Sequence, residues 1–117
     1  MLYYKSKYVY FISCGEFVKI GCAVSVKERL KSVQTGCPYP LAIVGAFESG
    51  YMGLTEQRVH EMFETYHYRG EWYKNVRQIK EFAVANTIQY LESAHQISAR
   101  TGSLSYLVKK HCNMSRL

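Results

Sequence analysis

The sequence contains no aspartate, since all nine of its acidic residues are glutamate. A two-metal phosphoryl-transfer site usually needs several clustered carboxylates, so the absence of aspartate excludes a metal site built from several Asp. Any metal chemistry must therefore depend on one or two glutamates and at most a nearby histidine.

Long apolar runs are also absent. No stretch approaches the roughly 20 apolar residues that a membrane-spanning helix needs, and the N-terminus is too polar for a signal peptide. We therefore expect a soluble cytoplasmic protein with no membrane partner.

Paired cysteines are missing as well, because Cys14, Cys22, Cys37 and Cys112 form no CxxC pair. Their spacing matches no zinc site, and the adjacent His111 and Cys112 are a weak ligand pair. The pattern predicts four free thiols in a reducing compartment.

Apolar residues make up 48% of the 117 residues and aromatic residues 15%, which predicts one domain with a core rather than a disordered chain. The net charge is +6, and residues 98–117 contribute four basic residues and no acid. We expect a single domain over residues 1–97 and a basic tail over residues 98–117. A basic excess favours a nucleic-acid partner, and a merely solvated basic surface is the alternative.

Residues 8–13 and 16–22 are rich in aromatic and β-branched side chains. Cys14-Gly15 between them predicts a hairpin with a two-residue turn. That turn pairs Tyr10 directly with Lys19. Because side chains alternate along a strand, one face is apolar and belongs to the core, and the other carries Tyr8, Tyr10, Lys19 and Gly21.

Helical patterns and a third strand follow the hairpin. Ser25 and Glu28 form a capping box for a helix that ends at Gly36, and a buried strand follows over residues 41–47. A second helix begins near Leu54, and a third covers about residues 76–96. The order ββαβαα predicts an α+β fold with a small antiparallel or mixed sheet flanked by helices.

Glu56 stands on the apolar stripe of the second helix, at the helix start. A carboxylate in that position is costly unless something balances it, and His60 lies one turn further on. The segment that contains Glu71 and Trp72 reads as a loop, and Asn75 resembles the cap of the third helix. Glu56 as an ordinary acid of a first helical turn is the simpler alternative.

The succession of "YVYFI", "VKIG", an Arg eight residues after that Gly, and a Glu on a later helix resembles the GIY-YIG nuclease superfamily. The "KIG" motif and the Glu71-Trp72 pair resemble the small phage and bacterial branch of that superfamily. The resemblance covers roughly residues 8–76. It implies a three-stranded antiparallel sheet flanked by helices, and a phosphodiesterase that uses one divalent ion, Mg²⁺ or Mn²⁺.

Site residues follow from the resemblance. It implies that Tyr10 is a catalytic base, that Arg29 contacts the phosphate and that Glu56 binds the metal. Lys19 replaces the second motif tyrosine, and its ammonium would favour the phenolate of Tyr10. The residues expected to support the site or contact substrate are Tyr8, His60, Glu71, Trp72 and Asn75.

The function expected is therefore metal-dependent endonuclease activity on nucleic acid, DNA rather than RNA. Two alternatives stay open: a relative that binds nucleic acid without cleaving it, and a protein-interaction domain. Lys19 stands where the resemblance has its second motif tyrosine, and this difference is the best argument for a relative that binds nucleic acid without cleaving it. The sequence leaves strandedness, sequence preference and oligomeric state open.

Overall fold

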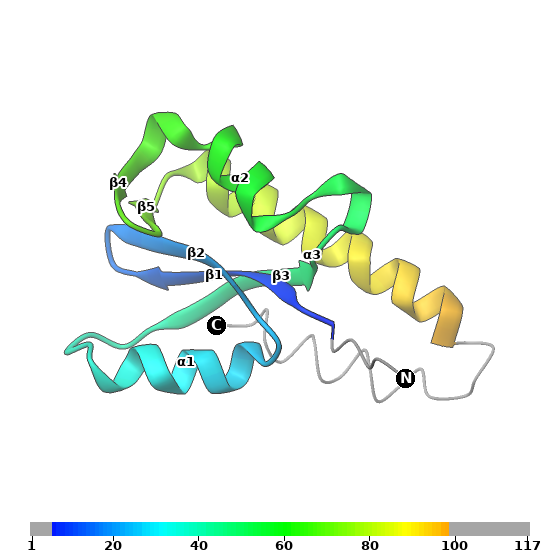
Figure 1. The fold of residues 1–117 in the computed structure, drawn as a ribbon, viewed down its shortest axis with the longest axis horizontal. Helices are drawn as coiled ribbons and strands as arrows, with labels where there is room; N and C mark the ends of the chain where they lie inside the picture. Colours follow the sequence, from blue (N-terminus) through cyan, green and yellow to red (C-terminus); the bar gives the residue numbers. More distant parts are fainter. Residues whose placement is uncertain (1–5, 99–117) are drawn as a thin grey trace.

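The computed structural model describes residues 6–98; residues 99–117 of the predicted basic tail lie outside the described part of the chain. Five strands form one antiparallel sheet in the order β3-β1-β2-β5-β4 (Figure 1). The strands are β1 (Tyr8–Cys14), β2 (Phe17–Ala23), β3 (Ala42–Glu48), β4 (His67–Arg69) and β5 (Trp72–Lys74).

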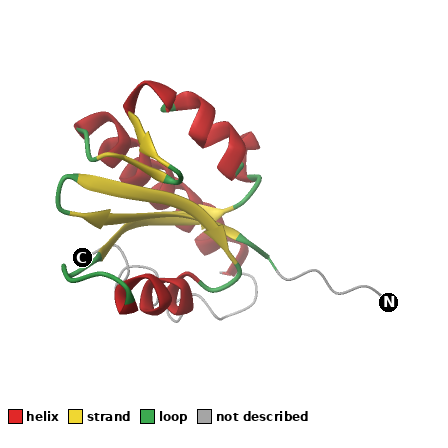
Figure 2. Cartoon of the chain, turned by 60° about the vertical axis from the view of Figure 1, so that its left-hand side comes forward, coloured by secondary structure: helices red, strands yellow, loops and turns green. Residues whose placement is uncertain are grey.

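Helices cover both faces of this sheet, with α1 (Val26–Thr35) on one side and α2 (Glu56–Met62) and α3 (Arg77–Ser98) on the other (Figures 1 and 2). Two short 3-10 turns, Tyr51–Gly53 and Glu64–Tyr66, flank α2. We call the two sides the α1 face and the α2–α3 face. No helix in residues 6–98 is both long and apolar enough to cross a membrane.

The predicted α+β class is confirmed, but the predicted three-stranded sheet is wrong. The segment read as a loop around Glu71 is a second hairpin, β4–β5, whose strands have only three residues each. Such short strands show no apolar alternation, because two or three residues are too few to display a period of two. The second helix is also shorter than the apolar stripe suggested, and Met62 is exposed.

The predicted pairing of Tyr10 with Lys19 is wrong by two residues. The turn is Gly15-Glu16 rather than Cys14-Gly15, and Gly15 has a φ of +56°, which glycine adopts without steric cost. Tyr10 therefore pairs with Gly21, and Lys19 pairs with Ile12. Because the shift is even, the predicted faces survive: Tyr10 and Lys19 still project from the same side.

Each face has its own apolar cluster. The larger one joins Phe11, Ile20 and Phe47 to Val59 of α2 and Ile79 of α3. The smaller one lies on the α1 face and consists of Tyr10, Ile12, Ala23, Val26, Ile43 and Ala46. Helix α1 packs against this smaller cluster through Val26 and Leu30, and the tyrosine of the cluster belongs to the candidate site.

The predicted start of α1 is confirmed. Ser25 is the N-cap, and its hydroxyl accepts a hydrogen bond from the backbone N–H of Glu28 at 3.2 Å. The helix ends at Thr35 with Gly36 as its C-cap, as the sequence predicted. These two boundaries fix α1 so that Arg29, in its second turn, lies over β1.

Candidate functional site

Gly21 makes room for Tyr10 at the centre of the candidate site. A Cβ at position 21 would overlap the hydroxyl of Tyr10, its cross-strand partner. Tyr10 is 0% exposed, so its ring fills the space that the glycine leaves open. Position 21, the glycine of the "KIG" stretch, therefore needs a residue without a side chain, because Tyr10 packs directly over it.

Arg29 covers Tyr10 from α1. Its Nη1 donates a hydrogen bond to Tyr10 Oη at 3.4 Å, and its guanidinium carbon lies 6.0 Å from the centroid of the tyrosine ring. The arginine itself is exposed, so the outer side of its guanidinium faces solvent. This geometry holds a cation at the surface directly above a buried phenol.

Lys19 forms an ion pair with Glu71, with Nζ 2.8 Å from Oε1. The backbone N–H of Ile20 also donates to the Glu71 carbonyl oxygen at 2.9 Å. Trp72, the partner of Lys19 on β5, has its ring 5.7 Å from the same Nζ. The β4–β5 hairpin, where the sequence predicted a loop, therefore brings Glu71 to Lys19.

Glu56, the first residue of α2, lies beside Glu71, and a hydrogen bond joins the two carboxyl groups. Burial raises the pKa of Glu56, and so do a hydrogen bond and charge repulsion from Glu71. Burial opposes ionisation of Glu71 too, but hydrogen bonds from Glu56 and Lys19 outweigh it and lower its pKa. Of the two carboxyl groups, Glu71 therefore ionises more readily than an ordinary glutamate and Glu56 less readily.

His60 supports this pair from the next turn of α2. Its Nε2 lies 2.8 Å from the carbonyl oxygen of Ile20 and 3.7 Å from Oε2 of Glu56. Because a carbonyl only accepts, Nε2 carries the proton and donates it to Ile20. The histidine thus ties α2 to β2 and keeps Glu56 near the sheet.

Tyr10 is protonated in this arrangement. Burial raises the pKa of its phenol, and the positive charges of Lys19 and Arg29 offset that rise only in part. The predicted influence of Lys19 on the Tyr10 pKa thus has the expected sign, although the two residues are not direct partners. The phenolate that a base role needs requires a further positive charge nearby.

The structure gathers six predicted residues, which we call the site cluster: Tyr10, Lys19, Arg29, Glu56, His60 and Glu71. Trp72 borders it. Two others lie elsewhere. Asn75 donates through Nδ2 to the carbonyl oxygen of Gly15 at 3.0 Å, tying β5 to the first hairpin turn. Tyr8 packs its ring edge-on against Tyr90 of α3, with 6.2 Å between ring centroids.

Sequence reasoning missed the closeness of Glu56 and Glu71. The only signal was the Glu-Trp pair, and its hairpin was too short to recognise. No group of three or more His, Cys, Asp or Glu side chains in residues 6–98 could hold a metal ion. Two carboxylates still suit Mg²⁺, which keeps several waters and takes one or two carboxylates together with substrate phosphates.

A comparison with known families finds one match, to the T5orf172 domain, over residues 7–89. That span includes all six residues of the site cluster and all five strands. No curated protein and no solved structure matches the chain.

Proposed function

Because the chain belongs to the T5orf172 domain family, which is endonuclease-related, we propose that it hydrolyses phosphodiester bonds in nucleic acid, with DNA as the substrate and Mg²⁺ or Mn²⁺ as the cofactor. The family supports a nuclease-related domain that interacts with nucleic acid. The cleavage chemistry, the metal and the roles of individual residues are our proposal.

The observation that carries this proposal is the contact of two carboxyl groups beside Lys19. Burial and the neighbouring Glu71 raise the pKa of Glu56, Lys19 pairs with Glu71, and Arg29 covers Tyr10 on the same side of the sheet as Lys19. A fold that needed only stability gains little from two repelling carboxylates, since burial disfavours their charge. The arrangement suits a divalent cation and an anionic substrate.

Each member of the site cluster has a proposed role. Glu56 and Glu71 hold the divalent ion, which supplies Lewis-acid polarisation of a phosphoryl oxygen when bound. Arg29 binds the phosphate through the exposed side of its guanidinium, whose fork of donors matches phosphate oxygens. Lys19 keeps Glu71 ionised, and His60 holds the start of α2 against β2.

Tyr10 is the proposed base. Tyr10 is fully buried and its hydroxyl accepts from the exposed Arg29. The base role therefore requires that Arg29 turn toward the phosphate and leave the hydroxyl open to water. The charge of a divalent ion on the neighbouring carboxylates would lower the pKa of the phenol further.

Binding without cleavage is the second candidate function. The specific observation in its favour is the complete burial of Tyr10 together with its raised pKa, since a buried neutral phenol can simply position Arg29. In that case Arg29 and Lys19 bind the phosphate backbone and no bond is broken.

The deciding experiment measures cleavage of labelled single-stranded and duplex DNA and RNA, with and without Mg²⁺ or Mn²⁺. We expect metal-dependent cleavage by the native protein and at least a 100-fold lower rate for Glu56→Gln, because the ion loses a ligand. Glu61→Gln is the matched control, since Glu61 is an exposed residue of the same helix and its loss should leave the rate unchanged. DNA binding with no cleavage under any metal would establish the second candidate instead.

A further inference from the structure

An aromatic surface continues the site cluster toward the first hairpin turn. We define it by four rings: Phe17, Tyr39, Tyr68 and Trp72. Trp72 is the link, because it pairs with Lys19 across β2 and β5. The surface therefore begins where the site cluster ends.

Two shallow hollows lie along this surface. One, of about 430 Å³, is lined by Phe17, Tyr39 and Pro40 with the turn residues, and the other, of about 220 Å³, by Phe17, Tyr68 and Trp72. Cys14 and Phe17 line both, so the hollows adjoin. Their linings combine four aromatic rings and a pyrrolidine with the carboxylate of Glu16 at the turn.

The rings here are displayed rather than buried. Tyr39 is 66% exposed and Tyr68 is 58% exposed, and Phe17 and Tyr68 lie 4.5 Å apart between ring centroids. Neither tyrosine belongs to the two apolar clusters of the fold. Exposed aromatic side chains next to a candidate site favour a ligand with flat groups that can stack on the rings.

Positive charges border the rings. The register pairs Lys74 with Phe17, which places this lysine on the same side of the sheet as the aromatic surface. Lys74 is exposed, and within residues 6–98 it forms no ion pair. Lys19, ion-paired with Glu71, adds a second positive charge where the rings meet the site cluster.

We propose that the aromatic surface binds a single-stranded DNA segment by stacking its unpaired bases, next to the phosphate that the site cluster would cleave. The substrate class is then DNA with an unpaired stretch, and this inference rests on the proposed function. Rings that border a basic path are how proteins hold single strands without reading their sequence. In a duplex the base faces are covered by their neighbours, so the rings have nothing to stack on. The choice of DNA over RNA follows the proposed function.

The single tryptophan of the chain makes the test direct, because Trp72 alone gives the tryptophan fluorescence. The full chain is titrated in EDTA with a 12-nucleotide DNA strand and, separately, with its duplex. We expect quenching and at least five-fold tighter binding of the single strand. Tyr68→Leu should weaken single-strand binding about five-fold or more, whereas Tyr68→Phe keeps the ring and should stay within two-fold of the native protein.

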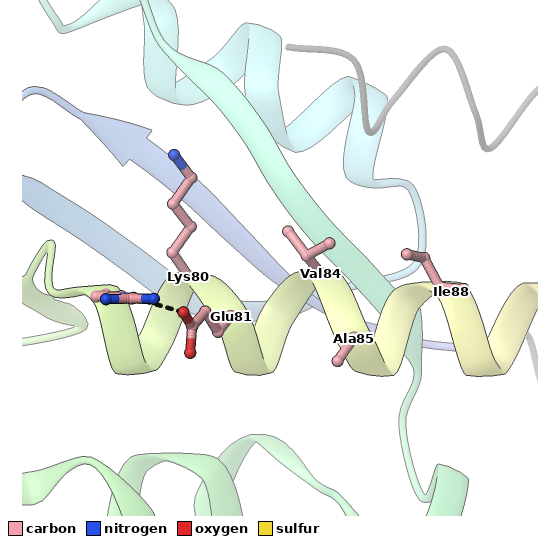
Figure 3. A pocket seen from close by; sticks show the side chains of 6 residues that line it. Lys80, Glu81, Val84, Ala85 and Ile88 are labelled. Carbon is pink, nitrogen blue, oxygen red and sulfur yellow. Dashed lines mark hydrogen bonds and ion pairs between the residues drawn. The ribbon is translucent and has the colours of Figure 1, made fainter.

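The control is Ile88→Ala, which lies in a separate hollow on α3 lined by Arg77, Lys80, Glu81, Val84, Ala85 and Ile88 (Figure 3). Its exposed side chain should not affect binding. Thermal unfolding of each variant shows that the fold persists, and Phe17→Leu repeats the test if Tyr68→Leu does not fold.

Three results would overturn the inference: equal binding of single strand and duplex, equal losses for Tyr68→Leu and Tyr68→Phe, or tighter binding of an RNA strand of the same sequence. The titration contains no divalent ion, so it does not depend on cleavage. A protein that stacks single strands but cuts nothing would refute the proposed cleavage alone. A protein that cuts duplex DNA with no single-strand preference would refute the aromatic-surface inference alone.

Discussion

Gly45 and Gly21 occupy comparable places on the two faces of the sheet, and they admit different neighbours. On the α2–α3 face, a Cβ at Gly45 would meet Oγ1 of Thr87 and, at 2.7 Å, the backbone oxygen of Ala83. Gly45 thus lets α3 approach β3 closely enough for Thr87 Oγ1 to accept from Ala46 N–H at 2.9 Å. On the α1 face, Gly21 makes room for a tyrosine hydroxyl instead.

The two glycines therefore contribute to different properties of the protein, one to stability and the other to the candidate site. The α2–α3 face uses its glycine to pack a helix, and the large apolar cluster beneath that helix stabilises the domain. The α1 face uses its glycine to seat a phenol under a guanidinium, beside charges that cost stability when buried. Substitutions around Gly45 should therefore act through folding, and those around Gly21 and Tyr10 should act through activity.

The largest effect that would sharpen this contrast is expected for Tyr10→Phe. Loss of a general base lowers the rate by about 100-fold or more, while loss of one weak hydrogen bond changes the free energy of unfolding by only about 1 kcal/mol. The rate is measured with the metal that supports cleavage, across a range of pH. If Tyr10 only positions Arg29, the rate should fall much less and KM should rise instead.

Tyr51→Phe is the matched control for that experiment. Tyr51 packs its ring against Phe47 on the other side of the sheet, with 6.2 Å between centroids. Removing its hydroxyl should leave both the rate and its pH dependence unchanged. An equal loss of activity in the two variants would break the contrast between the faces.

A smaller effect is expected when each glycine becomes alanine. Gly45→Ala should lower the free energy of unfolding by about 1–3 kcal/mol, because it overpacks against a backbone atom that cannot rotate away. The resulting fall in melting temperature, several degrees for each kcal/mol in a domain of this size, should account for any lost activity. The measurement is thermal unfolding alongside the cleavage rate well below the melting temperature.

Gly21→Ala should give the opposite balance. The new methyl would overlap the hydroxyl and the end of the ring of Tyr10, so it should displace the proposed base from Arg29 and lower the rate by more than the loss of stability explains. If both variants lose stability alone and keep their rates, Gly21 has only a packing purpose.

The sequence predicted the parts of this fold that have long local patterns. The capping box at Ser25 and the alternation in β1 and β2 are patterns formed by residues close together in the sequence. The hairpin register failed because both Cys14-Gly15 and Gly15-Glu16 suit a two-residue turn, and only the pairing with β3 and β5 separates them. The predicted register is wrong by two residues, an even number, so each side chain stays on its predicted face of the sheet. Tyr10 and Lys19 are therefore still close, as predicted, although they are not paired.

The site was predictable only in part. Tyr10, Arg29 and Glu56 followed from a resemblance in motif order, and the structure brings all three to one region. The pairing of Glu56 with Glu71 depends on a three-residue hairpin folding back against the start of α2, a contact between residues 15 apart. The burial of Tyr10 likewise depends on α1 closing over it, which no local pattern reveals.

The smallest expected effect concerns stability and pH at the carboxylate pair. Burial and the neighbouring Glu71 raise the pKa of Glu56, so the folded protein binds that proton more tightly than the unfolded chain does. Ionising Glu56 therefore costs stability, and the cost appears as the pH rises through the raised pKa. Glu71 has the opposite sign: its lowered pKa contributes stability that is lost as the pH falls below the usual range of a glutamate.

Glu56→Gln keeps the shape of the protonated acid, so it should melt at a higher temperature than the native protein at pH 7 and at nearly the same temperature near pH 4. Glu61→Gln, on the exposed side of the same helix, should show no such growing difference. Mg²⁺ should raise the melting temperature of the native protein at pH 7 through binding to the folded state, and should not do so for Glu56→Gln. A variant that melts lower at pH 7 would make Glu56 a structural residue, and the start of α2 would then depend for its stability on the same carboxyl group as the proposed activity.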